Sequence, residues 1–180
     1  NDLIILKDSF KYEIEVFVID WGKQIKKAVE EIFPTAKIQR CLTHIHRQVK
    51  NCISNNPKSD CGKEVQKIIT FEKFWNKENF IKEFNLWNEK WVDYLKEKST
   101  KWNKSWYTHR KLRASRSHIK NSIPFMFHYL KDENIKRSTN DLEWLNWLIS
   151  VQIQRHRWLR IDRLISFISL SISKNYLLSN

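Results

Sequence analysis

The sequence predicts an α/β chain that is mostly helical. Of its 180 residues only 2 are Gly and 3 are Pro, while 41% are hydrophobic and 13% are aromatic. So few helix breakers argue against many short strands with tight turns and favour long helices joined by polar connectors. Two short predicted strands near the start of the chain are the exceptions. A chain of this length is sufficient for a single domain with a substantial core.

A strand, a helix, a second strand and a second helix are predicted within residues 13–55. Residues 13–20 read EIEVFVID, a β-branched and aromatic run typical of a strand that ends in an acid. Apolar residues recur at helical spacing over 25–32. Residues 36–41 read AKIQRC, which predicts a second strand parallel to the first, and a helix is expected over 43–53.

Residues 56–137 are predicted to be entirely helical. Aromatic and apolar side chains recur every three or four residues from Phe80 to Leu95, as in the buried seam of one helix of about five turns. This stripe is expected to be core rather than a ligand site. Residues 138–180 are predicted to hold two more helices, one from about 139 to 153 and a last one over 161–178.

The chain is strongly basic. It has 33 Lys and Arg against 20 Asp and Glu, a formal net charge of +13. A fixed positive field attracts phosphates and releases their counterions on contact, so a nucleic acid is the natural partner. A basic but merely solvated surface, or a membrane surface, remains an alternative on charge alone.

The cysteine count and the hydropathy indicate the cellular compartment. An odd count of 3 Cys, without a run resembling a signal peptide, predicts reduced thiols in a cytoplasm. No stretch approaches about 20 uncharged apolar residues, so no membrane partner is expected.

Asp20 is the first candidate for a functional residue. It ends the first predicted strand, with Gly22 close behind, and open α/β sheets bind ligands beyond the carboxyl ends of their strands. The alternative is that Asp20 only caps the helix that follows.

Three ordered motifs resemble the Mutator-like bacterial insertion-sequence transposases. Asp20-Trp21-Gly22 resembles the second catalytic Asp of that family, which precedes Gly. Residues 33–44, FPTAKIQRCLTH, resemble the family's strand of the type V-Q-R-C, which is followed by two residues and a His. Residues 138–146, STNDLEWLN, look like its T-N-x-x-E-x-x-N helix, and His156-Arg157 resembles the His-Arg that commonly follows.

The resemblance implies a partial RNase H-like fold with a large all-α insertion. The 180 residues would then be the C-terminal part of a DDE transposase catalytic domain: a strand-helix-strand-helix part over 13–55, the insertion over 56–137, and the helix with Glu143 plus a C-terminal helix over 138–180. Asp20 and Glu143 would be catalytic. Residues that support the active site would be Gly22, Cys41, His44, Asn140 and Asn146.

The implied reaction explains the carboxylates. Cutting and joining phosphodiester bonds in line uses two Mg²⁺ or Mn²⁺ ions, which are hard and prefer carboxylate oxygens, so Asp20 and Glu143 would be metal ligands. The first acid of the triad would lie on a strand that precedes Asp20 by two further strands and a helix. That requires roughly forty residues or more at ordinary element lengths. We therefore expect the 180 residues to lack that acid and to be inactive alone.

Cys41 and His44 also admit a zinc site with Cys52 and Cys61. Structural zinc sites more often pair their ligands as C-x-x-C with a second close pair, so this alternative is the weaker one. For His44 the other alternative is a helix N-terminal residue bonded to solvent.

The densest basic stretch, residues 102–123, is predicted to follow a DNA backbone without reading its sequence. A solvated helix face is the alternative. The partners would be element ends and target duplex, with a homo-oligomer in the transposition complex, in a bacterial cytoplasm at the nucleoid. The competing class is a non-catalytic basic helical protein that binds nucleic acid. The expected DNA contacts are Arg110, Lys111, Arg113, Arg116, Arg155, His156 and Arg157.

Overall fold

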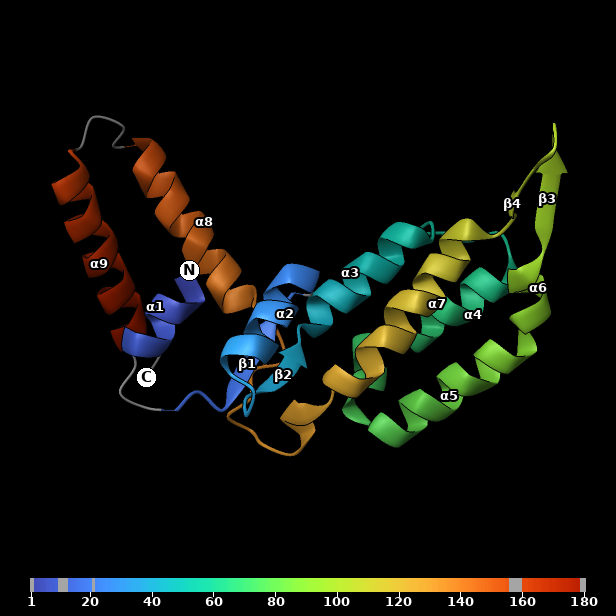
Figure 1. Cartoon of the computed structure of the whole chain (residues 1–180), viewed down its shortest axis with the longest axis horizontal. Helices are drawn as coiled ribbons and strands as arrows, with labels where there is room; N and C mark the ends of the chain where they lie inside the picture. The colour runs from blue at the N-terminus through green and yellow to red at the C-terminus, as the bar shows by residue number, and fades with distance from the viewer. Residues whose placement is uncertain (1, 10–12, 21, 156–159, 179–180) are drawn as a thin grey trace. The chain divides into compact units, whose positions relative to one another are not determined.

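The computed structural model describes residues 2–9, 13–20, 22–155 and 160–178. The chain divides into two compact units, Asn1–Ser138 and Thr139–Asn180, and each is described by itself. Helices dominate both units, and the strands that the structure describes are few and short (Figure 1). The expectation of a mostly helical chain is confirmed.

A parallel pair of strands lies near the start of the first unit. β1 (Val16–Ile19) and β2 (Lys37–Arg40) are aligned so that Ile19 faces Arg40, and α2 (Lys23–Ile32) connects them. The predicted strand-helix-strand unit is therefore present, with strands shorter than the runs that predicted them. A helix that precedes it, α1 (Asp2–Ser9), is attached to α2 by the Lys7 ammonium, which donates to the Ile32 carbonyl at 3.0 Å.

A small apolar core joins these strands to α2. Ile19, Val29 and Ile38 are buried together, one from each element. Removing such side chains from water is the main favourable term in folding. Leu3 of α1 and Phe125 also pack against this core, which connects the strand pair to other parts of the first unit.

The remainder of the first unit is a helical bundle with a larger core. α3 packs along α7 and α4 along α5, and Figure 1 shows the four helices side by side. The bundle contains α3 (Leu42–Cys52), α4 (Asp60–Ile68), η1 (Phe71–Trp75), α5 (Lys77–Lys90), α6 (Val92–Lys96), α7 (Arg110–Ser122), η2 (Ile123–Phe125) and η3 (His128–Leu130).

The aromatic seam predicted for 80–95 is core, but it is not one helix. Phe80, Phe84, Trp87 and Leu95 are buried, as expected. The helix nevertheless breaks at Trp91, which separates α5 from α6. The Trp91 indole donates to a Glu64 carboxylate oxygen of α4 at 2.8 Å, a tertiary contact that no helical periodicity encodes.

The expectation that residues 56–137 are entirely helical is wrong at one place. β3 (Lys98–Lys101) and β4 (Lys104–Tyr107) form an antiparallel hairpin between α6 and α7. The turn residues Trp102 and Asn103 have φ of 52° and 60°, a conformation incompatible with a right-handed helix. Thr and aromatic residues in the strands favour extended backbone, but the hairpin lacks the apolar alternation that makes strands recognisable.

The second unit is a pair of helices, α8 (Asn140–Arg155) and α9 (Ile161–Leu178), which contact one another. Both predicted helices are present. Among the described residues of the chain, no helix combines the length and apolar character needed to cross a membrane.

Candidate active site and nucleic-acid interface

Asp20 and Cys41 lie side by side at the carboxyl ends of the two parallel strands. Asp20 follows Ile19 directly and is exposed to solvent. The Cys41 amide donates to the Ile19 carbonyl at 2.8 Å, which continues the strand pairing one step beyond β2. Parallel sheets bind ligands beyond the carboxyl ends of their strands. The structure therefore brings these two predicted site residues to one edge.

Gly22 begins the helix that follows Asp20. It is the N-cap of α2, and its carbonyl accepts from the Lys26 amide at 2.9 Å. Its φ of −73° is open to any residue, and an added Cβ would lie 3.3 Å from the Ile25 side chain. The backbone thus does not demand glycine here, and a small residue requires only a slight shift of Ile25.

Cys41 and His44 lie at the start of α3. Cys41 is fully buried at the N-cap, and His44 lies in the first turn, half-buried. Cys61 is buried as well, and burial raises the pKa of its thiol to about 12, with the neighbouring Glu64 acting in the same direction. Within the part of the chain that the structure describes, no three His, Cys, Asp or Glu side chains gather as a metal cluster.

A buried arginine that the sequence did not single out as a site residue lies directly behind this edge. The Arg40 side chain is fully buried, and its guanidinium donates to the Ser122 hydroxyl, the Gln48 side-chain oxygen and the His118 carbonyl. Burial lowers the pKa of Arg40 to about 10, and the electrostatic interactions with Cys41 and Asp20 act in the opposite direction. The guanidinium therefore stays charged at neutral pH. Arg40 therefore supplies positive charge beside Asp20 while joining β2 to α3 and α7.

Gln39 makes a second set of hydrogen bonds from the same strand, three of them to residues far away in the sequence. Its amide nitrogen donates to the Arg40 carbonyl at 2.8 Å and to the Met126 carbonyl at 3.1 Å. Its amide oxygen accepts from the His128 backbone amide at 2.9 Å and from that of Tyr129 at 3.4 Å. The Gln-Arg-Cys run thus fixes the position of the strand end as well as carrying the predicted Cys41.

The second unit holds Glu143 near the start of α8. The Thr139 hydroxyl donates to a Glu143 carboxylate oxygen at 3.2 Å, and the Glu143 amide donates to the Thr139 carbonyl at 2.9 Å. Glu143 is half-buried, while Asn140 and Asn146 are exposed. Steps of three residues bring Asn140, Glu143 and Asn146 towards one side of the helix. These three predicted residues are together, and they belong to a different unit from Asp20, Gly22, Cys41 and His44.

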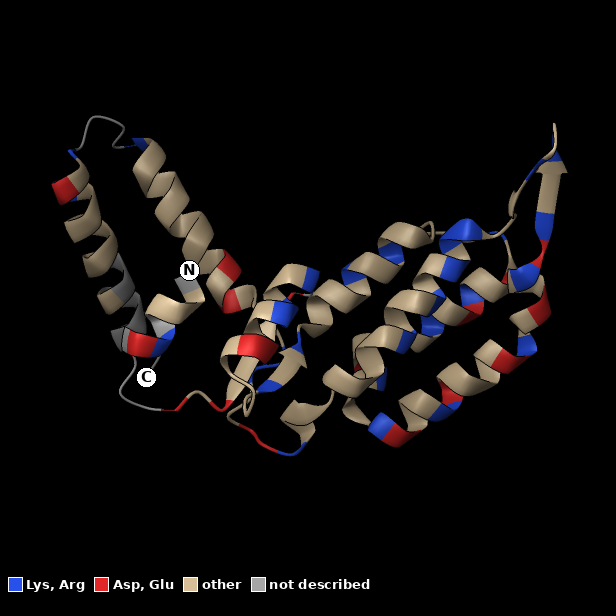
Figure 2. Ribbon diagram, viewed as in Figure 1, with Lys and Arg blue, Asp and Glu red and all other residues tan. Residues whose placement is uncertain are grey.

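The predicted DNA-contacting residues of α7 fall into two kinds. Arg110 and Lys111 are exposed in its first turn. Arg113 donates to the Leu95 carbonyl at 2.9 Å and stacks 3.5 Å above the Tyr107 ring, and Arg116 donates to the Asn88 side chain. Figure 2 shows Lys and Arg along α7 and on the neighbouring hairpin. Arg113 and Arg116 therefore hold the fold together, whereas Arg110 and Lys111 present their charge to solvent.

In the second unit, Arg155 ends α8 and is exposed. The predicted contacts His156 and Arg157 lie outside the described residues.

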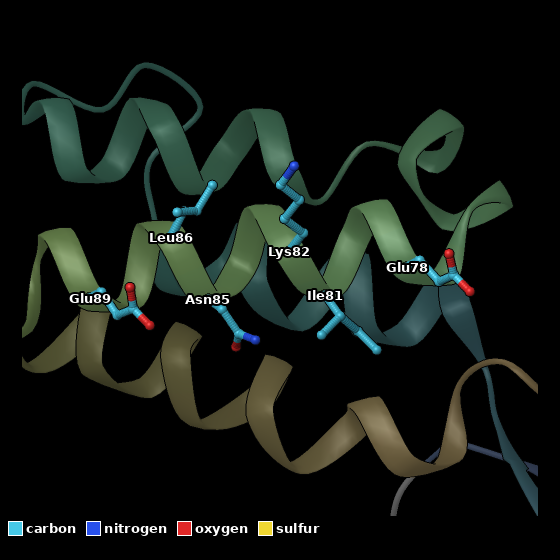
Figure 3. A pocket seen from close by; sticks show the side chains of 6 residues that line it. All are labelled: Glu78, Ile81, Lys82, Asn85, Leu86 and Glu89. Carbon is cyan, nitrogen blue, oxygen red and sulfur yellow. The ribbon is translucent and has the colours of Figure 1, made fainter.

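A shallow depression runs along α5. Its six lining residues come from this one helix, and in Figure 3 Lys82 and Leu86 point to one side while Ile81 and Asn85 point to the other. Ligand sites have polar groups that converge on one volume. These side chains diverge, so the depression is no candidate for a small-molecule site. The lining residues are Glu78, Ile81, Lys82, Asn85, Leu86 and Glu89.

A basic, mostly helical chain with a carboxylate at the end of a parallel strand fits a protein that processes nucleic acid. A family model described as "Transposase, Mutator family" matches residues 5–159, so the chain belongs to the Mutator family of transposases. Membership supports a role in DNA transposition. Comparisons with curated proteins and with solved structures gave no match.

Proposed function

We propose that this chain is part of an RNase H-like catalytic domain of a DDE transposase, which cuts and joins DNA with divalent metal ions. The observation that carries the proposal is Asp20 at the carboxyl end of a parallel strand, beside the Cys41 and His44 motif at the end of the next. The crossover helix α2 between the strands supports an RNase H-like sheet. Family membership supports the reaction class.

The residues present fit Mg²⁺ or Mn²⁺. Asp20 offers an exposed carboxylate, and Glu143 offers one that is half-buried and oriented by the Thr139 hydroxyl. Hard divalent ions prefer such oxygen donors and keep several water ligands. When bound, the ions would polarise the phosphate and activate the attacking oxygen. In this proposal Asp20 and Glu143 hold the metal, and the buried Arg40 adds positive charge near the Asp20 carboxylate.

A metal titration tests the proposal. Asp20→Asn and Glu143→Gln keep the side-chain shape and remove one charged oxygen ligand each. We expect each to weaken Mn²⁺ binding by at least about 10-fold, since even groups that only orient metal ligands are worth 10- to 100-fold. The readout is the fraction of bound Mn²⁺ in the electron paramagnetic resonance spectrum. Asp60→Asn, an exposed carboxylate on α4, is the matched control.

The double variant distinguishes one metal site from two separate ones. If both carboxylates bind the same ions, the second substitution adds less than its effect alone, because coupled residues are not additive. Mn²⁺ affinities that match the wild type in both single variants remove the metal site from the proposal.

The exposed cations of α7 are proposed to contact DNA phosphates. Each neutralised phosphate adds about 0.9 to the slope of log affinity against log salt. Replacing both Arg110 and Lys111 by Ala should therefore lower that slope by about 2 on a duplex of any sequence. Lys77→Ala with Lys82→Ala, two exposed lysines of α5, is the control. An unchanged slope in the α7 variant would place the DNA elsewhere.

A further inference from the structure

The hairpin between α6 and α7 carries a tryptophan in an unfavourable backbone conformation. Its two-residue turn consists of Trp102 and Asn103, both with positive φ. Such turns match the twist of the flanking strands and normally use Asn or Gly. Asn103 suits its position. A bulky residue such as Trp is an outlier there, and outliers of this kind are concentrated at functional sites.

Burial does not explain the presence of this tryptophan. Trp102 is 86% exposed, the highest exposed fraction among the large apolar side chains described as exposed. The positions beside it on the strands are polar or basic, with Thr100 and Lys101 before the turn and Lys104 and Ser105 after it. The indole therefore stands at the tip without an apolar surface around it. Trp106 and Tyr107, further along β4, are less exposed at 41% and 37%, and Lys98 and Arg113 lie over the Tyr107 ring.

The hairpin has a uniformly positive charge. Residues 98–107 read KSTKWNKSWY, with three lysines and no acid. Lys101 and Lys104 face one another across the turn and flank Trp102. Figure 2 shows blue segments on the hairpin strands beside the basic start of α7. The charge selects an anionic partner, and the nearby Arg110 and Lys111 extend the same field.

The base of the hairpin is firmly held, so its tip is presented in a defined direction. The Thr108 amide donates to the Glu97 carbonyl at 2.9 Å, and the Ser99 and Thr108 hydroxyls are 2.7 Å apart. His109 lies 2.9 Å from a Glu97 carboxylate oxygen and stacks on Tyr94 with ring centroids 3.7 Å apart.

We propose that the hairpin stacks Trp102 on an unpaired base of DNA while Lys101 and Lys104 contact the flanking phosphates. Aromatic side chains bind single-stranded bases by stacking, and every base offers a π face, so the contact tolerates any sequence. Fully paired duplex hides its bases in the stack. The hairpin therefore selects DNA that is opened or distorted. This inference rests on the proposed function only in taking DNA as the partner.

The experiment measures how the 180-residue chain binds two DNA duplexes that share the strand carrying one 2-aminopurine. One contains a single bulged 2-aminopurine, and the other pairs that base with thymine. Wild-type protein should bind the bulged duplex more tightly and quench the 2-aminopurine fluorescence. Trp102→Ala should lose roughly 5- to 150-fold in affinity for the bulged duplex, the range for one stacked base, with little change on the paired one. Trp75 of the same unit is 59% exposed, and Trp75→Ala should retain both the preference for the bulged duplex and the quenching.

Trp102→Gly separates stacking from an effect on the hairpin itself. Glycine is favoured at positive φ, so this variant should hold the turn at least as well as the wild type. Stacking predicts that Trp102→Gly loses the bulge preference and that Trp102→Phe keeps most of it. If Trp102→Gly still prefers the bulged duplex and still quenches the 2-aminopurine fluorescence, the inference is overturned. The proposed function would then still be supported by binding to the paired duplex and by the Mn²⁺ titration. A wild-type chain without any preference for the bulge also overturns the inference.

Discussion

Replacing Arg40 by Met is expected to lower the free energy of unfolding by about 3 kcal/mol. Methionine has similar length and is apolar, so it fills much of the space but donates no hydrogen bonds. Three buried or half-buried acceptors, on Ser122, Gln48 and His118, would lose a charged donor. Each buried group left unsatisfied costs about 1–3 kcal/mol, which outweighs the relief of removing a buried cation.

Urea unfolding followed by circular dichroism measures the effect of Arg40→Met. Arg110→Met changes an exposed arginine of the same unit and should stay within about 0.5 kcal/mol of the wild type. Arg40→Lys should recover less than half of the loss, because one ammonium cannot reproduce the planar set of donors. A stability of Arg40→Met equal to that of Arg110→Met would show that the arginine does not hold the bundle to β2.

The parallel strand pair could be predicted because its signals are local. Residues 13–20 form a β-branched and aromatic run, residues 36–41 form a second short run after Pro34 ends the helix, and that helix has a clear apolar face. Asp20 could be identified in the same way, since a strand end is a position along the sequence. The helix of Glu143 was also found, and Glu143 lies near its start as the motif implies.

What the sequence did not reveal depends on residues far apart in the chain. Arg40 contacts groups 78 and 82 positions away, and Gln39 contacts groups 87 to 90 positions away. No periodicity records such partners. The hairpin could not be predicted for a different reason. It is exposed on both faces, so its strands need no apolar alternation. Its turn has Trp102 at a position where Gly would have indicated a turn.

Arg113 shows why a charge count alone does not identify a DNA contact. By sequence it belongs to the same basic run as Arg110 and Lys111. In the structure its guanidinium stacks on Tyr107 and bonds to Leu95, which couples the base of the hairpin to α6 and α7. The proposed interface therefore depends on the exposed cations, and the partly buried ones determine how the hairpin is presented to DNA.

Gln39→Leu is expected to destabilise the first unit by about 3 kcal/mol and to loosen the segment around His128 first. Leucine matches the buried volume but removes both donors and the acceptor. The Met126 carbonyl and the His128 amide would then lie without their partner. Hydrogen exchange should show the His128 and Tyr129 amides losing protection, while amides of α4 and α5 change only with the global stability.

Two further variants serve as comparisons for Gln39→Leu. Gln24→Leu, at an exposed position of α2, should leave stability within about 0.5 kcal/mol. Gln39→Glu keeps an acceptor for the two amides but cannot donate to the carbonyls when ionised, so His128 and Tyr129 should retain more protection than in Gln39→Leu. Equal protection of these amides in wild type and Gln39→Leu would mean that the 126–129 segment is held by its apolar side chains alone. The hydrogen bonds of Gln39 would then play no part in fixing the strand end that carries Cys41.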